Sequence, residues 1–222
     1  MRKSNLKNIS CPHCQQSMTI DSLIFINGGI ESDLRTKLLN STLFLHKCPH
    51  CQHEFVYENP FLYSDCKHKF VIYLRPGEID AAADIADEIS AVMRQHSLIT
   101  HEDYHYRIVS DHLQLSEKLQ LFEHGHDDRI MEICKFIYQG KIIKDHPDTI
   151  ITNAFYLNDH DHELFLFISQ QETFQVAFDQ TLYDEIFEDF KGQIKQGSHF
   201  LQIDQQWVFN LIKTEFERRN RQ

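Results

Sequence analysis

Hydrophobic and polar residues follow two different periods along this chain. Up to Gly77, short apolar runs rich in β-branched and aromatic residues lie between turn residues, a pattern that favours strands. Arg75-Pro76-Gly77 ends this part, because proline and glycine together interrupt regular structure. The predicted elements are strands at 18–28, 54–58 and 70–74 and a short helix at 32–40.

Beyond Gly77 the pattern becomes mainly helical. The predicted helix 78–96 places apolar residues on one stripe, at Ala82, Ile85, Ala86, Ile89, Val92 and Met93. Acids begin and lysines end the predicted helix 127–144, as the helix dipole prefers. The remaining predictions are helices at 111–123, 182–196 and 205–219 and strands at 104–109, 149–157, 163–169 and 174–178.

Composition indicates a packed globular protein. Aromatic residues are 12% of the 222 residues, and glycine and proline are scarce. The polar N-terminus lacks the apolar segment of a signal peptide, and no run reaches the roughly 18 apolar residues of a membrane span. We therefore expect a cytoplasmic protein with no membrane partner.

The net charge of −11 is unevenly distributed. Residues 1–77 hold nine Lys/Arg against six Asp/Glu, whereas the remainder holds thirteen against twenty-seven. An acidic body repels phosphate backbones, which disfavours nucleic acid as a partner. The less favoured alternative of a nucleic-acid-binding ribbon requires six lysines to gather on one face: Lys3, Lys7, Lys37, Lys47, Lys67 and Lys69.

Two identical Cys-Pro-His-Cys tetrads supply the clearest chemistry, at Cys11 and Cys14 and again at Cys48 and Cys51. Two residues between cysteines let one tight turn aim both sulfurs at one ion, and four thiolates suit tetrahedral zinc. We predict that these four cysteines bind one zinc ion. Such a ligand set is closed to substrate, so the ion would be structural. Iron in a rubredoxin-like arrangement is the minority alternative, and two unrelated redox pairs are another.

The tetrads and the text around them resemble the CpXC proteins, a bacterial family named for two Cys-Pro-x-Cys motifs. The resemblance is closest over residues 9–76 and continues more loosely through 116–119 and 127–132. It implies a zinc-ribbon-like domain of unknown biochemical function. Glycine often follows each motif in such knuckles, whereas Gln15 and Gln52 follow here and would need a conformation that glycine adopts more easily.

The other cysteines and histidines near the tetrads have simpler interpretations. We expect His13 and His50 to point to solvent instead of replacing a cysteine ligand. A second site built from His53, Cys66 and His68 is less favoured than an ordinary strand or loop. Cys134 falls on the apolar stripe of its helix and is expected in the core.

Three histidine-rich segments between residues 101 and 162 leave an enzyme as the alternative. His101, Glu102 and His105 spell H-E-x-x-H, which binds zinc only on a helix, and His112 is a possible third ligand. The strand-like run after His105 favours a chance match. The other segments contain His124, His126, Asp127 and Asp128, and Asp159, His160, Asp161 and His162. The first of these two segments is explained without catalysis as a helix stop followed by the acidic first turn of a new helix. The second is explained as the polar tip of a hairpin.

The sequence as a whole predicts an α+β protein with three parts. These are a β-rich zinc-ribbon-like module at 1–77, a helical segment at 78–147 and a small mixed α/β unit at 148–222. In the alternative division, the last two parts form one domain. No catalytic or cofactor-binding residue is assigned, and an enzyme is the less favoured reading. The favoured function is a binding or interaction module for a protein partner that the sequence does not identify.

Overall fold

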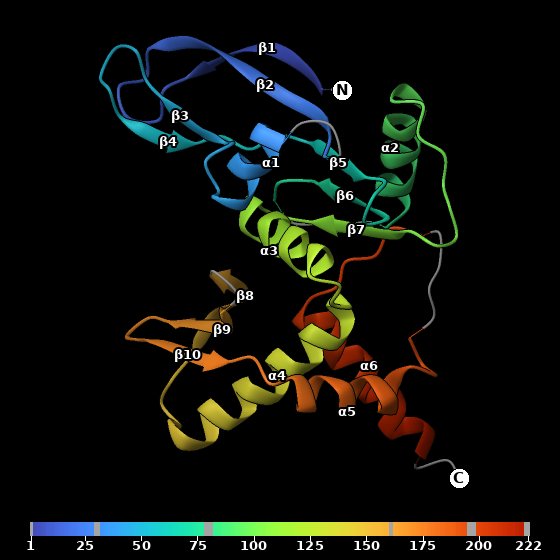
Figure 1. Cartoon of the computed structure of the whole chain (residues 1–222). Coiled ribbons are helices and arrows are strands. Elements are labelled where there is room, and N and C mark those ends of the chain that lie inside the picture. Colours follow the sequence, from blue (N-terminus) through green and yellow to red (C-terminus); the bar gives the residue numbers. More distant parts are fainter. Residues whose placement is uncertain (1, 29–31, 78–81, 160–161, 195–198, 220–222) are drawn as a thin grey trace. The chain divides into compact units, whose positions relative to one another are not determined.

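The computed structural model describes residues 2–28, 32–77, 82–159, 162–194 and 199–219 (Figure 1). The chain divides into two compact units. Unit 1 comprises Met1–Ser116 and Gln196–Leu201, and unit 2 comprises Glu117–Lys195 and Gln202–Gln222. The division falls inside helix α3 (His112–Glu123).

Unit 1 contains seven of the described strands and two complete helices. In chain order they are β1 (Arg2–Ser10), β2 (Ser17–Asn27), α1 (Ser32–Leu39), β3 (Leu45–Lys47), β4 (Glu54–Val56), β5 (Phe61–Asp65), β6 (Phe70–Leu74), α2 (Ala82–Gln95) and β7 (His105–Val109). Five strands form one sheet in the order β1-β2-β5-β6-β7, and β3 pairs with β4 in a separate hairpin.

The β1–β2 hairpin extends well beyond the rest of the five-stranded sheet. β1 pairs with β2 over its whole length, but β2 pairs with β5 only from Phe25 to Asn27. The side chain of Asn59 accepts a hydrogen bond from the Ser22 hydroxyl (2.6 Å) and donates one to the Leu23 carbonyl (2.8 Å). Because β2 has no second strand neighbour before Phe25, most of the hairpin is a two-stranded ribbon. Such a ribbon is marginally stable unless other groups support it.

The core of unit 1 lies against the buried strands β5, β6 and β7. One face of α2 contributes Ile85, Ile89 and Met93, which pack with Tyr73 and Tyr106. Gly28 directly follows β2, and a Cβ atom there would lie 1.8 Å from the Tyr63 hydroxyl oxygen. Glycine is needed here because the backbone approaches a buried tyrosine ring.

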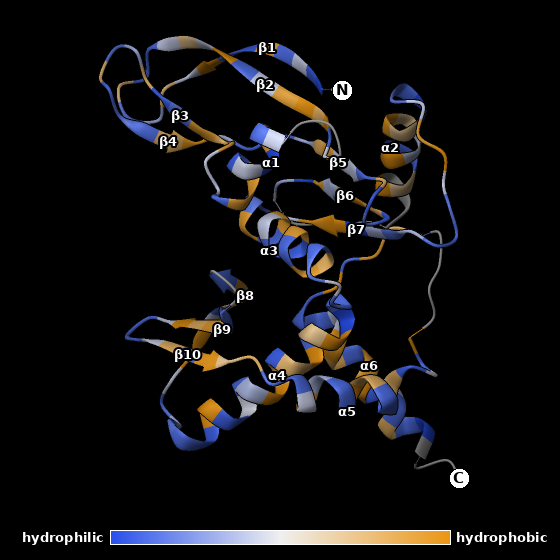
Figure 2. Ribbon diagram, viewed as in Figure 1, coloured by the Kyte–Doolittle hydropathy of each residue, from blue (hydrophilic) through white to orange (hydrophobic). Residues whose placement is uncertain are grey.

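Unit 2 packs helices against a three-stranded antiparallel sheet of order β10-β9-β8. Its core joins Ile130, Ile133 and Cys134 of α4 to Phe165 and Phe167 of β9. Figure 2 shows the hydrophobic colours of these elements. Besides the end of α3, its elements are α4 (Asp128–Asp145), β8 (Ile151–Asp159), β9 (His162–Ser169), β10 (Thr173–Ala177), α5 (Gln180–Phe190) and α6 (Gln205–Arg219).

The predicted mixed α+β fold is confirmed, and most predicted elements occur within a few residues of their expected bounds. Three strands were missed, and one of them, β3, has only three residues. β1 is polar and forms because β2 pairs with it, and β5 is buried throughout, so it shows no alternation. The predicted helix 182–196 is shorter, since α5 ends at Phe190. Residues 78–81 of the predicted helix 78–96 lie outside the described residues, as do the side chains of Ala82, Ala83 and Asp84.

The predicted domain boundaries near Gly77 and Pro147 stay predictions. Among the described helices, none is long and apolar enough to cross a membrane.

Candidate metal centre

The two Cys-Pro-His-Cys tetrads fold into matching knuckles. In the first, the Gln15 amide donates to the Cys11 carbonyl (2.9 Å), and the Cys11 amide donates to the Gln16 carbonyl (3.0 Å). In the second, Gln52 donates to Cys48 (2.9 Å) and Cys48 donates to His53 (2.9 Å). The repeated wording of the sequence thus produces a repeated backbone turn.

The residue after each tetrad has left-handed backbone geometry. Gln15 has a φ of 60° and Gln52 has a φ of 62°. This is the conformation that glycine adopts at lower cost, as expected from the glycine common at this position in related knuckles. Both glutamines therefore carry local strain in the turns that position the cysteines.

Two hairpins bring the four sulfurs together. The first knuckle links β1 to β2, and the second links β3 to β4. The four Sγ atoms all lie within 4.8 Å of one another. Cys11 and Cys51 are 3.8 Å apart and Cys14 and Cys48 are 3.7 Å apart, far longer than the roughly 2.05 Å of a disulfide bond. The four-cysteine cluster is therefore suitable for a metal ion.

The cluster has an apolar side and a more open side. Cys11 and Cys48 are buried, whereas Cys14 and Cys51 are half-buried. Met18 and Ile20 of β2 pack against the buried pair, with Ile9, Phe55 and Tyr57 around them. These apolar side chains exclude water from one side and fix the β1–β2 ribbon beside the second knuckle.

Neighbouring groups move the thiol pKa values in opposite directions. The backbone N–H of Cys14 stabilises the Cys11 thiolate and lowers the pKa of Cys11 to about 6. The backbone N–H of Gln16 favours the Cys14 thiolate, but burial and the neighbouring thiols outweigh it and raise the pKa of Cys14 to about 12. Adjacent negative charges oppose each other, so four thiolates require a cation among them.

The histidines of the tetrads are exposed, as predicted. The rings of His13 and His53 stack with centroids 4.8 Å apart, and His50 Nε2 lies 3.3 Å from the Ser17 carbonyl oxygen. His68 Nδ1 contacts Asp65 at 3.1 Å, and Cys66 is exposed. These residues do not contribute to the four-sulfur cluster.

Cys134 lies in the core of unit 2, as expected from its position on an apolar stripe. Burial raises the pKa of its thiol to about 12. A buried, protonated thiol of this kind is unreactive.

The H-E-x-x-H segment is not helical. His101 and Glu102 are exposed in a turn, and His105 begins strand β7. The two histidines therefore do not share a helical face, which the zinc-binding form of this motif requires. His112 instead places Nδ1 2.6 Å from a carboxylate oxygen of Glu58.

The described side chains of the second histidine-rich segment contact different protein groups. His124 Nδ1 lies 2.7 Å from the Gln120 carbonyl oxygen, and His126 Nε2 lies 2.7 Å from a Glu163 oxygen. Asp127 is the N-cap of α4, and its carboxylate also pairs with Arg129. In the third segment, His160 and Asp161 lie outside the described residues.

Two of the six lysines named for a nucleic-acid interface have partners within unit 1. Lys3 donates to the Gln95 carbonyl (3.1 Å), and Lys69 pairs with Asp103 (2.9 Å). A gathered basic face stays a prediction.

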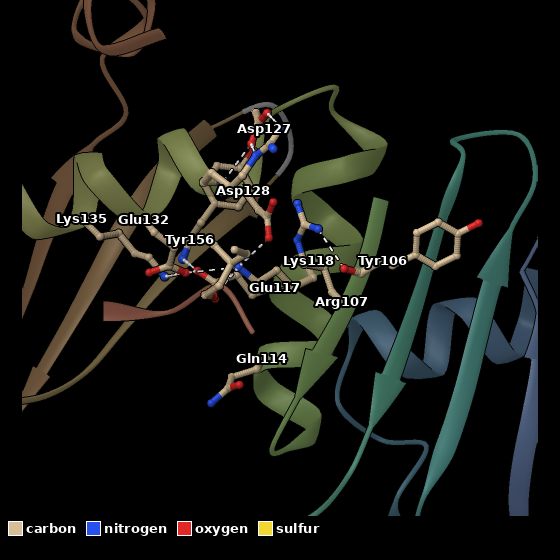
Figure 3. A network of polar contacts seen from close by, with 12 residues as sticks. Tyr106, Arg107, Gln114, Glu117, Lys118, Asp127, Asp128, Glu132, Lys135 and Tyr156 are labelled. Carbon is tan, nitrogen blue, oxygen red and sulfur yellow. Dashed lines mark hydrogen bonds and ion pairs between the residues drawn. The ribbon is translucent and has the colours of Figure 1, made fainter. Parts of the chain in front are cut away.

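A buried charge network in unit 2 was not predicted. We use this name for Glu117, Lys118, Asp128, Glu132 and Lys135 (Figure 3). The ammonium of Lys118 lies 3.0 Å from Asp128 and 3.3 Å from Glu132, and that of Lys135 lies 2.8 Å from both Glu132 and Glu117. Acids and bases thus alternate along the network. The sequence contains no clear signal for it, because Glu117 lies two residues from Leu115 and therefore off the apolar stripe of Leu115 and Leu119.

The side chains of the network also form hydrogen bonds with backbone N–H and C=O groups. Glu117 accepts a hydrogen bond from the Tyr156 amide (2.7 Å). Lys118 donates to the Ile203 carbonyl (3.0 Å), and Lys135 donates to the Ala154 carbonyl (3.2 Å). Burial acts to lower the pKa of both lysines, but the adjacent carboxylates outweigh it and raise them. These contacts connect α3, α4, β8 and the segment before α6.

The fold and the cluster define a mixed α+β protein with two cysteine knuckles that share one possible metal site. Residues 9–135 match the family model described as CpXC protein, so the chain belongs to the CpXC family. The match extends the resemblance of residues 9–76 through α3 and into α4. No curated protein and no solved structure matches the chain.

Proposed function

We propose that this chain is a cytoplasmic zinc-binding protein whose four-cysteine cluster holds one structural zinc ion and keeps a protein-interaction module folded. The spacing of the sulfurs carries the first half of this proposal. Sulfurs about 2.3 Å from a tetrahedral zinc ion are separated by about 3.8 Å. The Cys11–Cys51 and Cys14–Cys48 separations of 3.8 and 3.7 Å fit that tetrahedron.

A structural role follows from the ligand set. Four cysteines occupy every position of a tetrahedral ion, which leaves none for water or substrate. The ion would therefore coordinate the four cysteines alone and would not bind a substrate. Its contribution is to join the β1–β2 and β3–β4 hairpins, because each hairpin supplies two ligands.

An interaction role is supported by the distribution of the other reactive side chains. In the first two histidine-rich segments, His101 and Glu102 are exposed, His112 and His126 contact Glu58 and Glu163, and His124 contacts the Gln120 carbonyl oxygen. A reducing compartment suits the six cysteines, all of which are free thiols. We therefore favour binding to a protein partner over catalysis.

Elemental analysis tests the zinc assignment. The protein should be purified without added metal and washed with a mild chelator, because fifteen histidines can retain ions weakly. We expect about one zinc per chain after the wash. One iron per chain would replace zinc with the rubredoxin-like alternative, and a folded, metal-free protein would refute the metal site.

Paired cysteine variants identify the ligands. Cys48→Ser removes a buried ligand of the cluster and should reduce the bound zinc to well below one per chain. Cys66→Ser is the matched control, since Cys66 is exposed outside the cluster and its loss should leave the zinc content unchanged. Equal zinc loss in both variants would contradict the assignment.

A further inference from the structure

The outer edge of β1 is an open strand edge. β1 is the terminal strand of its sheet and pairs with β2 alone among the described strands. In an antiparallel pair, every second residue turns its N–H and C=O away from its neighbour. Every second residue of the nine in β1 therefore presents its N–H and C=O outward, and this row is a template for one more strand (Figure 1).

The side chains of β1 are basic and polar. The strand contains Arg2, Lys3 and Lys7 and no acid. Leu6 is 77% exposed at the middle of the strand, beside Asp21 of β2. Lys7 lies on the opposite face of the ribbon, next to Ile20 in the pairing register. Leu6 is therefore open to solvent on one face, whereas Lys7 on the other face is half-buried beside the buried Ile20.

The charge of the edge selects its partner. A second β1 strand would bring another set of cations to the same edge, and like charges across strands are destabilising. An acidic strand instead forms opposite-charge pairs with Lys7 and with Lys3, which lies on the same face of β1. Because neighbouring residues face opposite sides, a partner residue beside Leu6 must be apolar while the next one, beside Lys7, is acidic.

We propose that β1 binds an extended segment of a partner protein that alternates apolar and acidic residues, by adding it as a sixth strand to the sheet. Main-chain hydrogen bonds would provide most of the affinity, and the cations and Leu6 would select the sequence.

This inference rests on the proposed function, because the metal site holds β1 in place. β1 ends at Ser10, directly before the ligand Cys11. Ile9 packs beside the cluster, and the ribbon has no other strand along most of its length. Loss of the ion should therefore disorder the edge and weaken binding.

The test uses full-length protein and a fluorescein-labelled ten-residue peptide of alternating valine and glutamate. We expect saturable binding by fluorescence anisotropy, with amide shift changes in the nuclear magnetic resonance spectrum centred on residues 2–10. A peptide with lysine in place of glutamate should bind at least tenfold more weakly. Absence of binding, or shift changes confined to other residues, would overturn the proposal.

Two N-methylated peptides distinguish strand addition from simple charge attraction. One is methylated on its odd residues and the other on its even residues, so their side chains and charge are the same. Only one of the two edges faces β1, so one peptide should bind and the other should lose binding. Equal affinity for both peptides would exclude strand addition.

A charge reversal locates the site. Lys7→Glu should weaken binding of the glutamate peptide by about fivefold or more, since one favourable cross-strand pair becomes repulsive. Lys67→Glu makes the same change of charge at an exposed lysine outside β1 and should leave the affinity within twofold. Equal weakening by both variants would show that only net charge matters.

Zinc content measured on the same samples keeps the two proposals separate. If protein with one zinc per chain does not bind the peptide, the β1 inference alone is refuted. Folded protein that lacks metal refutes the proposed structural site, whatever the peptide does.

Discussion

The four-cysteine cluster and the buried charge network solve a similar problem in different ways. Each region gathers ionisable side chains from separate elements at buried or partly buried positions. In the network, lysines and carboxylates alternate, so every charge has an opposite neighbour within the protein. The four sulfurs of the cluster carry only one sign when ionised, so their neutralising charge has to come from a bound ion.

This difference indicates what each region depends on. Unit 2 carries its own counter-charges and should fold without an external component. The ribbon of unit 1 has a small apolar cluster and few strand neighbours, so it should depend on metal. The following changes test that contrast, beginning with the largest expected effect.

Metal removal should affect the two regions unequally. Structural zinc sites contribute about 10–16 kcal/mol of apparent binding free energy at neutral pH, so a strong chelator should unfold the knuckles. Hydrogen exchange should then become fast in β1 to β4 and stay slow in α4 and β9. Similar loss of protection in both regions would show that they do not differ in this way.

Breaking the network by removing one lysine should destabilise unit 2 strongly. Lys135→Met leaves the carboxylates of Glu117 and Glu132 without one buried partner, which should cost about 3–5 kcal/mol in urea unfolding. Lys144→Met changes an exposed lysine of the same helix and should cost less than about 0.5 kcal/mol. A small effect of Lys135→Met would mean that water already screens the network. Zinc content should not change in either variant.

Acid should weaken unit 2 partly through Glu163. Desolvation raises the pKa of Glu163, but hydrogen bonds from Tyr156 and His126 outweigh it and place the pKa below its usual value. A carboxyl with a depressed folded pKa stabilises the protein above its unfolded pKa of about 4.3, and this stability is lost as the pH falls through the folded pKa.

Glu163→Gln should therefore flatten the fall in unfolding free energy between about pH 6 and pH 3. Glu172→Gln, at an exposed position, is the control and should leave the slope as in the wild type. An unchanged slope in the Glu163 variant would assign the acid sensitivity to other groups.

Relief of strain in the knuckles should give the smallest effect. Gln15→Gly and Gln52→Gly place glycine at φ values near 60° and should each stabilise metal-loaded protein by a few tenths to about 1 kcal/mol. Gln16→Gly, at a position without a positive φ, should instead destabilise slightly. Thermal unfolding of zinc-loaded samples would measure both, and a loss of stability in Gln15→Gly would argue against strain there.

The candidate site was predictable because its information is local. The spacing within each tetrad fixes a turn, and repetition of the tetrad indicates that two turns share one ion. Even the strained conformation at Gln15 and Gln52 follows from the comparison with glycine at that position. The distance between the two turns was not predictable, because Cys11 meets Cys51 and Cys14 meets Cys48 across 40 and 34 residues of chain.

The buried charge network shows the opposite case. Asp128 lies in the first turn of α4, where an acidic side chain interacts favourably with the helix dipole. This position alone does not predict that it is buried. Its burial against Lys118 depends on how α3 and α4 pack. Charged residues in a sequence are normally expected at the surface, so only the packed structure reveals them as core residues.

The sequence by itself determined the helices, most strands, the paired knuckles and the mixed fold class, because periodicity and turn chemistry act over a few residues. Tertiary structure decided the open edge of β1, the burial of β5 and the pairing of charges between α3 and α4. It also decided that His101 and His105 do not share a helical face, since His105 begins a strand, and that His124 and His126 have different partners. These outcomes depend on contacts between distant residues, and no local pattern encodes such contacts.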